Sequence, residues 1–342
     1  MYLAYEPISK KPDATTFVPP ELFEAQQQAK KTLPASLTKN WDDWVAKEIG
    51  FDSKENLWDN FSSEQIDSIG LVIYNFENGQ NFIIADETGI GKGRILSGIC
   101  RWALMHNKKV MFFTEREHLF SDFWRDLNDT KTIDLLSNPI VFHSSSKVYY
   151  NDEVVLRGTK KIVTQIQNDG FDDDTNFVMT NYSQINLKQH KKTKKDAMVE
   201  FCRDNIIILD ECHNATGDSA TRKFLLSLTD VSKNIIYSSA TFMKDESQLD
   251  LYEKTISFDA DTIELFKRLL RTDQELILRK IFTYELTRKL QFWRREHQPL
   301  DVGWKSIVCE NLDEQSQYID KYSEIINKLF ELSNAISKEP SL

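Results

Sequence analysis

The residues best suited to chemistry form a short glycine-containing stretch, Ala85-Asp-Glu-Thr-Gly-Ile-Gly-Lys-Gly-Arg94. An apolar run, residues 81–85, leads into it, and a helical pattern over residues 95–107 follows it. A glycine-rich turn between a strand and a helix lets backbone N–H groups and a helix N-terminus bind phosphate. Lys92 adds a positive charge for the β and γ phosphates. The stretch therefore predicts a phosphate-binding loop.

The loop departs at two positions from the usual pattern G-x-x-x-x-G-K-[ST]. Asp86 replaces the first glycine, and Gly93 stands where a hydroxyl side chain normally binds magnesium. Gly89 and Gly91 still let the backbone approach an anion without a Cβ in the way. Taken alone, the stretch leaves one alternative open, an ordinary glycine-containing turn between a strand and a helix.

A pair of carboxylates follows the most apolar short run of the chain, Asn205-Ile-Ile-Ile-Leu209. The next residues are Asp210-Glu211-Cys212-His213. Carboxylates at the end of a buried strand are costly unless something binds them. In a phosphoryl-transfer site the first acid would hold magnesium and the second would polarise the attacking water. The alternative is an acidic pair that faces solvent.

Small hydroxyl residues follow a further apolar run, Asn234-Ile-Ile-Tyr237. They form the stretch Ser238-Ser-Ala-Thr241, which could relay between a nucleotide site and a neighbouring domain. Strands that end in polar residues place them along one edge of a parallel sheet, where α/β proteins bind ligands. We therefore expect this stretch, the acidic pair and the loop at the same edge.

The elements that must position these groups alternate along the chain. Apolar runs at residues 109–113, 139–143 and 177–180 predict further strands, with helical patterns before and after them. This alternation predicts an α/β fold, a mostly parallel sheet flanked by helices.

Upstream of the loop, Ser62 is a candidate N-cap of a helix that contains Ile66, Ile69 and Ile73 on one face. Gln65 has two readings. It fits the third helical position of a capping box with Ser62, and it also lies where helicase-like ATPases place a glutamine that contacts adenine. The sequence leaves both readings open.

Changes in composition divide the chain into three parts. Residues 1–38 are polar and contain several prolines, which predicts an N-terminal arm that is ordered only where it docks. Residues 39–250 contain the alternating pattern, and residues 251–342 are mainly helical. Residues 144–175 predict an insertion or long connection with a hairpin, and their acidic run indicates a solvated turn rather than a calcium loop.

Apolar spacing in the last part predicts helices over residues 265–270 and 275–295. A strand over residues 304–309 and a helix over residues 313–332 are expected to follow. The stretch Phe292-Trp-Arg-Arg295 would lie on the second of these helices and pack its aromatic side chains against the protein; stacking on bases is the alternative. On this reading Arg294 and Arg295 face the helical extension.

The composition, 342 residues with 40% hydrophobic and 28% charged, indicates a soluble globular protein. Four cysteines without a C-x-x-C pair favour a reducing cytoplasm and argue against a zinc site or a disulfide framework. Apolar runs are too short for a membrane helix, and the N-terminus lacks a signal pattern. A net charge of −10 does not favour nucleic acid, but it permits a local basic groove. The basic run at residues 188–195 is a candidate for phosphate contact or a solvated segment.

The order of the motifs GIGKGR, DECH and SAT resembles that of superfamily 2 helicase-like ATPases. The details resemble the strawberry notch branch, in which GKGR replaces the usual GKT. Residues 61–67 and 81–84 are similar to bacterial and phage members of that branch. Residues 112–115 resemble motif Ia and residues 180–182 resemble motif Ib, so that the resemblance covers about residues 40–245.

The resemblance implies a RecA-like domain that binds ATP and magnesium and hydrolyses ATP at the γ-phosphate. It assigns the catalytic roles to Lys92 at the phosphates, Asp210 at magnesium and Glu211 at the attacking water. The implied nucleotide-binding residues are Gln65, Thr88, Gly89, Ile90, Gly91, Lys92, Gly93 and Arg94. The implied coupling residues are Ser239, Ala240 and Thr241. The implied contacts with nucleic acid, with DNA favoured over RNA, are Thr180, Lys191 and Lys192.

Related ATPases complete their site with an arginine from a second RecA-like domain, and we expect that domain, in cis or in trans, to lie outside these 342 residues. The sequence therefore predicts the ATP-binding half of a helicase-like, nucleic-acid-dependent ATPase or translocase. It would be cytoplasmic, without a membrane partner, and weakly active alone. The alternative is a non-catalytic, ATP-gated scaffold or partner-binding module. A phosphotransferase on the same loop is disfavoured by the DECH and SAT motifs.

Overall fold

The computed structural model describes residues 3–185, 192–215, 219–242, 249–252, 255–256, 260–270 and 275–297. The described residues up to 256, together with 283–297, form one compact unit, and those in 260–282 belong to a second. The predicted strand over residues 304–309, the predicted helix over 313–332 and Lys191 lie outside the described residues.

The helices are α1 (Pro20–Thr32), α2 (Ala35–Lys39), α3 (Trp41–Glu48), α4 (Lys54–Asn60), α5 (Ser63–Glu77), α6 (Lys92–Met105), α7 (Leu119–Asp129), α8 (Lys160–Asp169), α9 (Lys192–Cys202), α10 (Ser219–Val231), α11 (Leu249–Tyr252), α12 (Ala260–Leu270) and α13 (Glu275–Arg288). The strands are β1 (Leu3–Ala4), β2 (Phe17–Val18), β3 (Phe82–Ile84), β4 (Val110–Thr114), β5 (Ile140–Val141), β6 (Lys147–Tyr150), β7 (Glu153–Arg157), β8 (Phe177–Asn181), β9 (Ile206–Asp210), β10 (Asn234–Ser238) and β11 (Phe292–Trp293).

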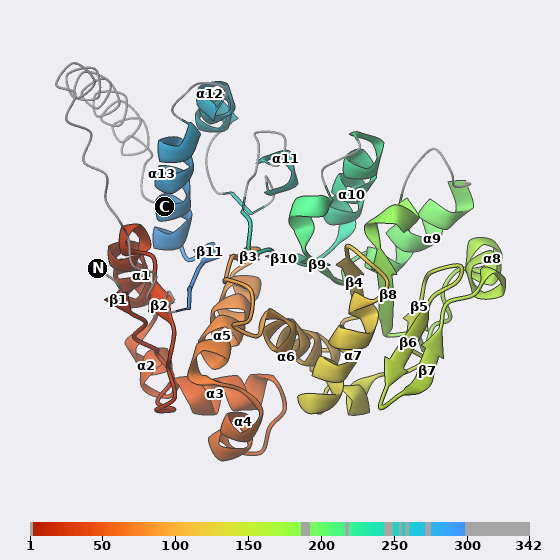
Figure 1. Cartoon of the computed structure of the whole chain (residues 1–342), viewed down its shortest axis with the longest axis horizontal. Helices are drawn as coiled ribbons and strands as arrows, with labels where there is room; N and C mark the ends of the chain where they lie inside the picture. Colours follow the sequence, from red (N-terminus) through yellow and green to blue (C-terminus); the bar gives the residue numbers. More distant parts are fainter. Residues whose placement is uncertain are drawn as a thin grey trace, which may run out of the picture. The chain divides into compact units, whose positions relative to one another are not determined.

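A seven-stranded sheet forms the core of the first unit, in the order β11-β3-β10-β9-β4-β8-β5. Its paired strands run parallel throughout. Helices α5, α6 and α7 cover one face, and α9 and α10 cover the other (Figure 1). Because both faces are covered, β3, β4, β8 and β10 are buried along their whole length. The predicted α/β fold, a mostly parallel sheet flanked by helices, is confirmed.

The register places the predicted site residues at one edge of this sheet. Ile84 at the end of β3 is paired with Ser238 on β10, and Ser238 is paired with Asp210 on β9. Thr114 at the end of β4 is paired with Asn181 on β8. Since all of these strands run in one direction, the phosphate loop, the acidic pair and the SAT motif follow at the carboxyl edge.

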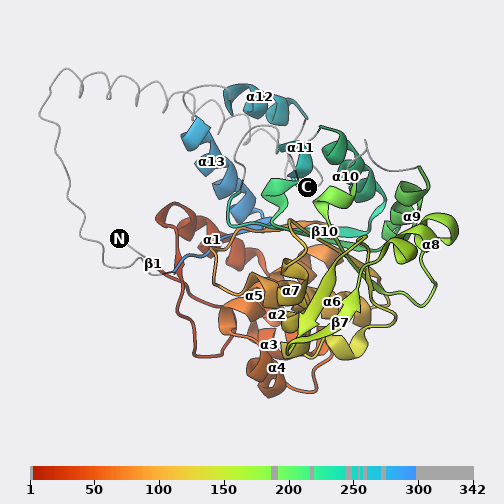
Figure 2. The same ribbon diagram turned by 45° about the vertical axis from the view of Figure 1, so that its right-hand side comes forward.

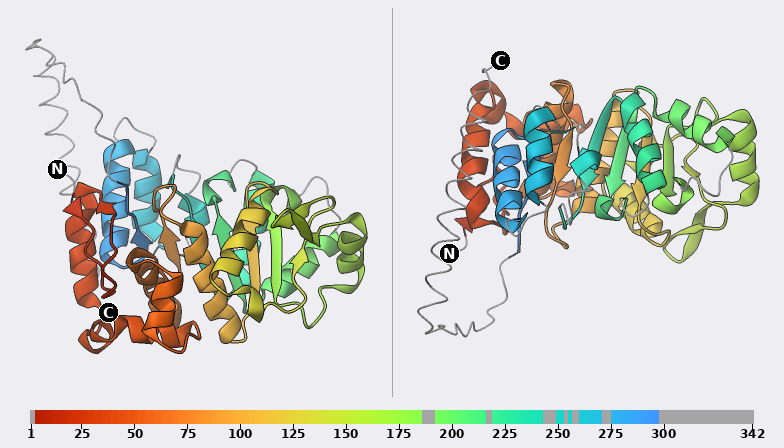
Figure 3. Two further views of the ribbon diagram at one scale, coloured as in Figure 1. Left: turned by 60° about the horizontal axis from the view of Figure 1, so that its bottom comes forward. Right: turned by 90° about the horizontal axis from the view of Figure 1, so that it is seen from above.

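The N-terminal arm is docked on α5. The Tyr5 hydroxyl donates to Asp67 Oδ2 at 2.6 Å, and the backbone N–H groups of Ile8 and Ser9 donate to the same carboxylate at 2.7 and 2.8 Å. Farther along, Glu64 Oε1 accepts a hydrogen bond from Thr15 N at 2.7 Å. The arm lies at the opposite end of the sheet from the β6–β7 hairpin (Figure 3).

Residues 144–175 form the hairpin β6–β7 and the helix α8, which Figure 2 brings forward. Asn151 and Asp152 both adopt positive φ, 50° and 65°, as a two-residue hairpin turn requires. Thr159 caps α8 by accepting a hydrogen bond from Ile162 N at 3.2 Å. The hairpin expected here is confirmed.

The helix expected over residues 275–295 ends earlier than predicted. Helix α13 stops at Arg288, and Leu290 takes a left-handed φ of 58°. Phe292 and Trp293 then form β11, parallel to β3, and both side chains are fully buried. Pairing with the open edge of β3 outweighs helix propensity here. The expectation that Arg295 faces a helical extension is therefore wrong.

Candidate nucleotide-binding site

The phosphate loop needs its two central glycines for both conformation and space. Gly89 and Gly91 adopt left-handed φ angles of 96° and 91°. A Cβ at Gly91 would lie 2.3 Å from Gln65 Nε2, and one at Gly89 would lie 2.9 Å from His297 Nε2. Between them Ile90 is buried, whereas Thr88 is exposed. The loop thus presents backbone, not side chains, at its centre.

Lys92 is the first residue of α6, and only 9% of it is exposed. Its Nζ donates to the carbonyl oxygens of Asp86 at 3.0 Å and Glu87 at 3.4 Å. The Lys92 side chain therefore folds back over the loop, and its ammonium group contacts the backbone at the start of the loop. The first turn of α6 offers backbone N–H groups without helical partners beside this charge. This donor set fits the phosphates of a nucleotide.

Asp210 is held by hydroxyl groups from the two neighbouring strands. Ser238 Oγ donates to Asp210 Oδ1 at 3.0 Å, and Thr114 Oγ1 donates to Oδ2 at 3.4 Å. Burial, followed by repulsion from Glu211, raises the pKa of Asp210 to about 6, while Lys92 acts in the opposite direction. A carboxylate oriented in this way and short of positive charge fits magnesium, which takes one or two carboxylates together with nucleotide phosphates.

Glu211 has an unusual backbone for a residue with a side chain, with φ 48° and ψ 42°. A left-handed residue of this kind costs about 1–3 kcal/mol and persists where the surroundings impose it. Its Oε2 lies 3.3 Å from His213 Nδ1, and 28% of its side chain is exposed. The carboxylate thus lies beside His213 and remains partly open to water.

The SAT motif connects the acidic pair to the strand of the phosphate loop. Ser239 N donates to Ile84 O at 3.0 Å, and Ser239 Oγ donates to Thr241 O at 3.0 Å. Ser239 Oγ also forms a 2.8 Å hydrogen bond with His213 Nδ1. Ala240 lies between these residues, half-buried.

Gln65 forms the capping box that its spacing predicts. Ser62 Oγ accepts from Gln65 N at 3.4 Å, and Gln65 Oε1 accepts from Ser62 N at 3.1 Å. Its amide Nε2 also donates to Ile90 O at 3.4 Å, so that the cap of α5 touches the phosphate loop. Contact with adenine stays a prediction, and it would require this amide to change partners.

Gly93 and Arg94 face α7. A Cβ at Gly93 would lie 2.0 Å from Asp126 Oδ2. The Arg94 guanidinium forms a salt bridge of 2.7 Å with Asp129 and donates to Asn60 O at 3.3 Å. The structure therefore shows Arg94 engaged with α7 and α4, and its phosphate contact stays a prediction.

Of the three residues predicted to contact nucleic acid, Thr180 is the one whose side chain the structure describes. Thr180 is fully buried and donates to Phe142 O at 3.0 Å. Lys192 begins α9, but its side chain, like all of Lys191, lies outside the described residues. Tyr182 of the same motif donates its hydroxyl to Asp210 O at 2.8 Å.

Three contacts of the site appear only in the folded chain. Thr114 is a partner of Asp210, and its signal in the sequence is its position at the end of a buried strand at the carboxyl edge. His213, which follows the acidic pair, is hydrogen-bonded to Ser239. Arg295, which the helical pattern places on a helix, binds Asp86 in the loop instead.

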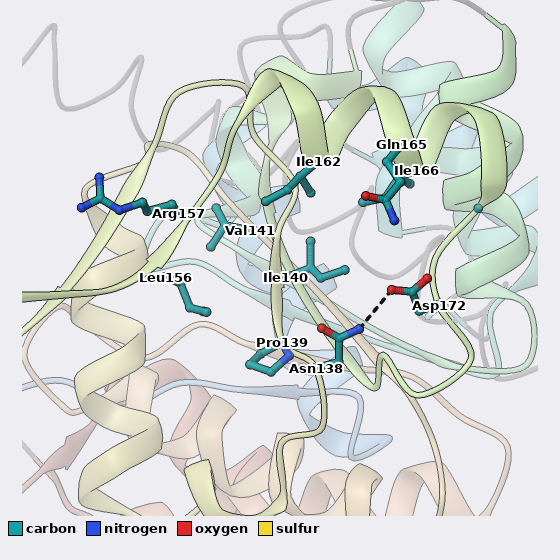
Figure 4. A pocket seen from close by; sticks show the side chains of 11 residues that line it. Asn138, Pro139, Ile140, Val141, Leu156, Arg157, Ile162, Gln165, Ile166 and Asp172 are labelled. Atoms are coloured by element: carbon teal, nitrogen blue, oxygen red, sulfur yellow. Dashed lines mark hydrogen bonds between the residues drawn. The ribbon is translucent and has the colours of Figure 1, made fainter.

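A cavity of about 260 Å³, whose lining residues Figure 4 shows, lies beside the outermost strand β5. Its wall includes Ile140 on β5, Leu156 on β7 and Ile166 on α8, with Asn138 hydrogen-bonded to Asp172 at 3.3 Å. Four strands, β10, β9, β4 and β8, separate β5 from β3. This cavity is therefore separate from the nucleotide site.

No cluster of three or more His, Cys, Asp or Glu side chains suited to a metal ion occurs in the described part of the chain. Within the same residues, no helix combines the length and apolar character needed to cross a membrane.

Comparison with known proteins gives a family. The sequence profile described as "P-loop containing NTP hydrolase pore-1" matches residues 24–279. Protein strawberry notch homolog 2 of Mus musculus is 30% identical over 173 residues, which cover 47% of this chain and 11% of that protein. Protein strawberry notch homolog 1 of Homo sapiens is 26% identical over 224 residues, which cover 58% of this chain and 15% of that protein. The chain thus matches a small part of these relatives.

Among solved structures, the Sulfolobus solfataricus SWI2/SNF2 ATPase core in complex with dsDNA is 14% identical, with a TM-score of 0.44 over 68% of this chain and 44% of that chain. A nuclease-deletion mutant of the Type ISP restriction-modification enzyme LlaGI, in complex with a DNA substrate mimic, is 18% identical, with a TM-score of 0.41 over 64% and 23%. On the family match and the geometry of its loop, the chain belongs to the P-loop containing NTP hydrolase pore-1 family, of the strawberry notch type.

Proposed function

We propose that the chain is the ATP-binding half of a helicase-like ATPase that acts on nucleic acid. One observation carries the proposal. Lys92 opens α6 directly after the loop that follows β3, and Asp210 ends β9, so that both lie at the carboxyl edge of the sheet, close enough for the ammonium group to lower the pKa of the carboxyl group. A phosphate cradle beside an oriented carboxylate is the arrangement that hydrolysis of a nucleoside triphosphate requires.

Each residue then has one role. Lys92 and the N–H groups of the loop bind the β and γ phosphates. Asp210, which Ser238 and Thr114 orient, would hold the magnesium ion. Magnesium, when bound, neutralises charge on the phosphates. Glu211 orients and polarises the water for in-line attack, with His213 beside its carboxylate. Ser239 and Thr241 relay the state of the site to a neighbouring domain.

A second RecA-like domain, in cis or in trans, would complete this site. The transition state needs a positive group opposite the γ-phosphate. Arg94 binds Asp129, Arg294 binds Glu296 and Arg295 binds Asp86. Because these three guanidinium groups already bind carboxylates, the missing charge is assigned to the other domain.

Contact with nucleic acid is proposed at the carboxyl edge of the sheet, where the nucleotide site also lies. An open cleft of about 490 Å³ lies beyond β4, lined by Glu117, His118, Ser121, Ser145, Lys147 and Tyr149. Tyr149 is 47% exposed there, beside Lys147 on the same strand. An exposed aromatic ring next to a cation is suited to stacking on a base and neutralising a phosphate.

The test is the variant Glu211→Gln, assayed with the second domain supplied. The amide cannot accept the proton or polarise water well, so hydrolysis should fall by at least about a hundredfold while ATP affinity stays within about twofold. Nucleic acid should stimulate the parent and not the variant. Equal turnover in both would remove Glu211 from the mechanism and favour a scaffold that merely binds ATP.

A further inference from the structure

The segment of residues 291–297, here called the strap, runs alongside β3 and continues past its end along the phosphate loop. Ile83 N donates to Gln291 O at 2.9 Å, and Ala85 N donates to Trp293 O at 2.8 Å. The ladder then enters the loop, where Glu87 N donates to Arg295 O at 2.9 Å. Glu87 Oε2 accepts from His297 N at 2.8 Å.

Arg295 in the strap is fully buried, and its guanidinium group donates hydrogen bonds to residues of α5 and of the phosphate loop. Its Nε donates to Asp86 Oδ1 at 3.1 Å, its Nη2 binds Asp86 Oδ2, and its backbone N also donates to Oδ1 at 2.8 Å. Nη2 donates to Ser68 Oγ at 2.6 Å, and Nη1 donates to Glu64 O. Tyr5 lies 5.1 Å from the guanidinium carbon, measured to the ring centroid.

This contact explains Asp86, which stands where most phosphate loops have a glycine. Asp86 is fully buried and accepts three hydrogen bonds from Arg295. Burial makes the charged carboxylate costly, and a two-pronged guanidinium group compensates with fixed geometry. The pair thus sets both the position and the orientation of the residue that opens the loop.

The Arg295–Asp86 pair is also connected to Lys92 through the backbone of the loop. The carbonyl oxygens that accept from Lys92 Nζ belong to Asp86 and Glu87. Arg295 holds the side chain of the first and the backbone N–H of the second. Movement of Arg295 would therefore displace the groups that aim the ammonium at the phosphates.

The strap is also held on its outer side. Phe17 and Glu296 exchange two backbone hydrogen bonds, both of 2.8 Å, and Gln26 Nε2 donates to Arg294 O at 2.8 Å. The loop is therefore anchored through the strap to β2 and α1, and it is shaped before any nucleotide arrives. Preorganisation of this kind increases affinity because the loop loses less freedom on binding.

We propose that Arg295 is a positioning residue of the nucleotide site, which acts through Asp86 to hold the phosphate loop and Lys92 in their binding geometry. The proposal rests on the proposed function, since it requires that the loop bind a nucleotide. It makes the strap, distant in sequence from every known motif of the site, part of the binding machinery.

The experiment compares Arg295→Met, Asp86→Asn and the double variant, with Arg294→Met as the matched control. Arg294 is the adjacent arginine and pairs with Glu296, away from the loop. Thermal unfolding reports the fold, and titration with a fluorescent ATP analogue and magnesium reports the dissociation constant. Each single variant leaves a lone buried charge and should lower Tm, whereas the double variant leaves none and should recover part of the loss.

In the double variant, the affinity for the ATP analogue should stay low even though Tm partly recovers. The dissociation constant of the double variant should stay at least about tenfold above that of the parent, and that of Arg294→Met should stay within about twofold. If the double variant regains both stability and full affinity, Arg295 merely stabilises the fold and the inference is overturned. If the parent itself binds no nucleotide, the proposed function fails, and the inference fails with it.

A substitution at an exposed residue tests the contact between the strap and the loop without affecting the buried core. Glu87 is exposed, and Glu87→Gln weakens its contact with His297 N without leaving a buried charge. The dissociation constant should rise about threefold, since a hydrogen bond to a charged group is replaced by a weaker one. An unchanged constant in this variant would also count against the inference.

Discussion

The Asp126 carboxylate fills the space that a side chain at Gly93 would need, because its Oδ2 lies 2.0 Å from where a Cβ at Gly93 would stand. Asp126 comes from α7, which packs beside the first turn of α6. The missing hydroxyl in this phosphate loop is therefore linked to packing between two helices. Burial raises the pKa of Asp126 to about 6, which fits a carboxyl group pressed against a helix.

We predict that Gly93→Thr destabilises the protein and that Asp126→Ala reverses much of the loss. Forcing a side chain into filled space costs about 1–3 kcal/mol, and the second change removes the obstacle. Unfolding in urea would measure both values, with Asp126→Ala alone as the control. Additive effects of the two substitutions would show that the contact does not constrain position 93.

We predict that Asp210→Asn raises Tm at neutral pH and loses this advantage in acid. The folded state raises the pKa of Asp210 to about 6 from an ordinary value of 3.8. The native protein therefore binds the proton more tightly than the unfolded chain, and the parent loses stability as pH rises from about 4 through about 6. The asparagine variant has no such charge to bury.

Thermal unfolding between pH 4 and pH 7.5 would check this prediction. The difference in Tm between variant and parent should be smallest near pH 4 and should reach its full size above pH 6. Asp173→Asn, a substitution at an exposed acid, is the control for the loss of one carboxyl group. A difference for Asp210→Asn that does not change with pH would show that Asp210 titrates normally in the folded protein.

We predict that residues 1–342 alone bind ATP but hydrolyse it slowly, with little stimulation by nucleic acid. The arginine that a second domain supplies in related phosphoryl-transfer systems is worth about 10³–10⁵ in rate. Steady-state phosphate release, with and without single- and double-stranded DNA and RNA, would measure the deficit. Turnover of about 1 per second or faster would mean that self-association, or an arginine of this chain, completes the site.

The fold was predictable because its signals are local. Five short apolar runs, each followed by polar residues, specify the buried strands β3, β4, β8, β9 and β10 within one residue at each end. The capping box of Ser62 and Gln65 was equally readable, because it depends on residues three apart. These features need no knowledge of what lies across the sheet.

Long-range contacts could not be predicted in the same way. Residues 292–293 have apolar side chains compatible with a helix, and only the open edge of β3 makes them a strand. The role of Asp86 likewise depends on Arg295, 209 residues away in sequence. The sequence shows that position 86 departs from the usual loop pattern, but the residue that binds Asp86 is identified only in the folded structure.

The binding of MgATP to the parent and to Lys92→Ala tests the central claim most directly. In the proposed site the Lys92 ammonium group supplies the side-chain charge of the loop to the phosphates, and its removal should leave the fold intact. Nucleotide should raise the Tm of the parent by mass action, as for any ligand that binds only the folded state. Lys233→Ala, at an exposed position, should behave as the parent. The account predicts no rise in Tm for Lys92→Ala at the same ATP concentration, and an undiminished rise would contradict it.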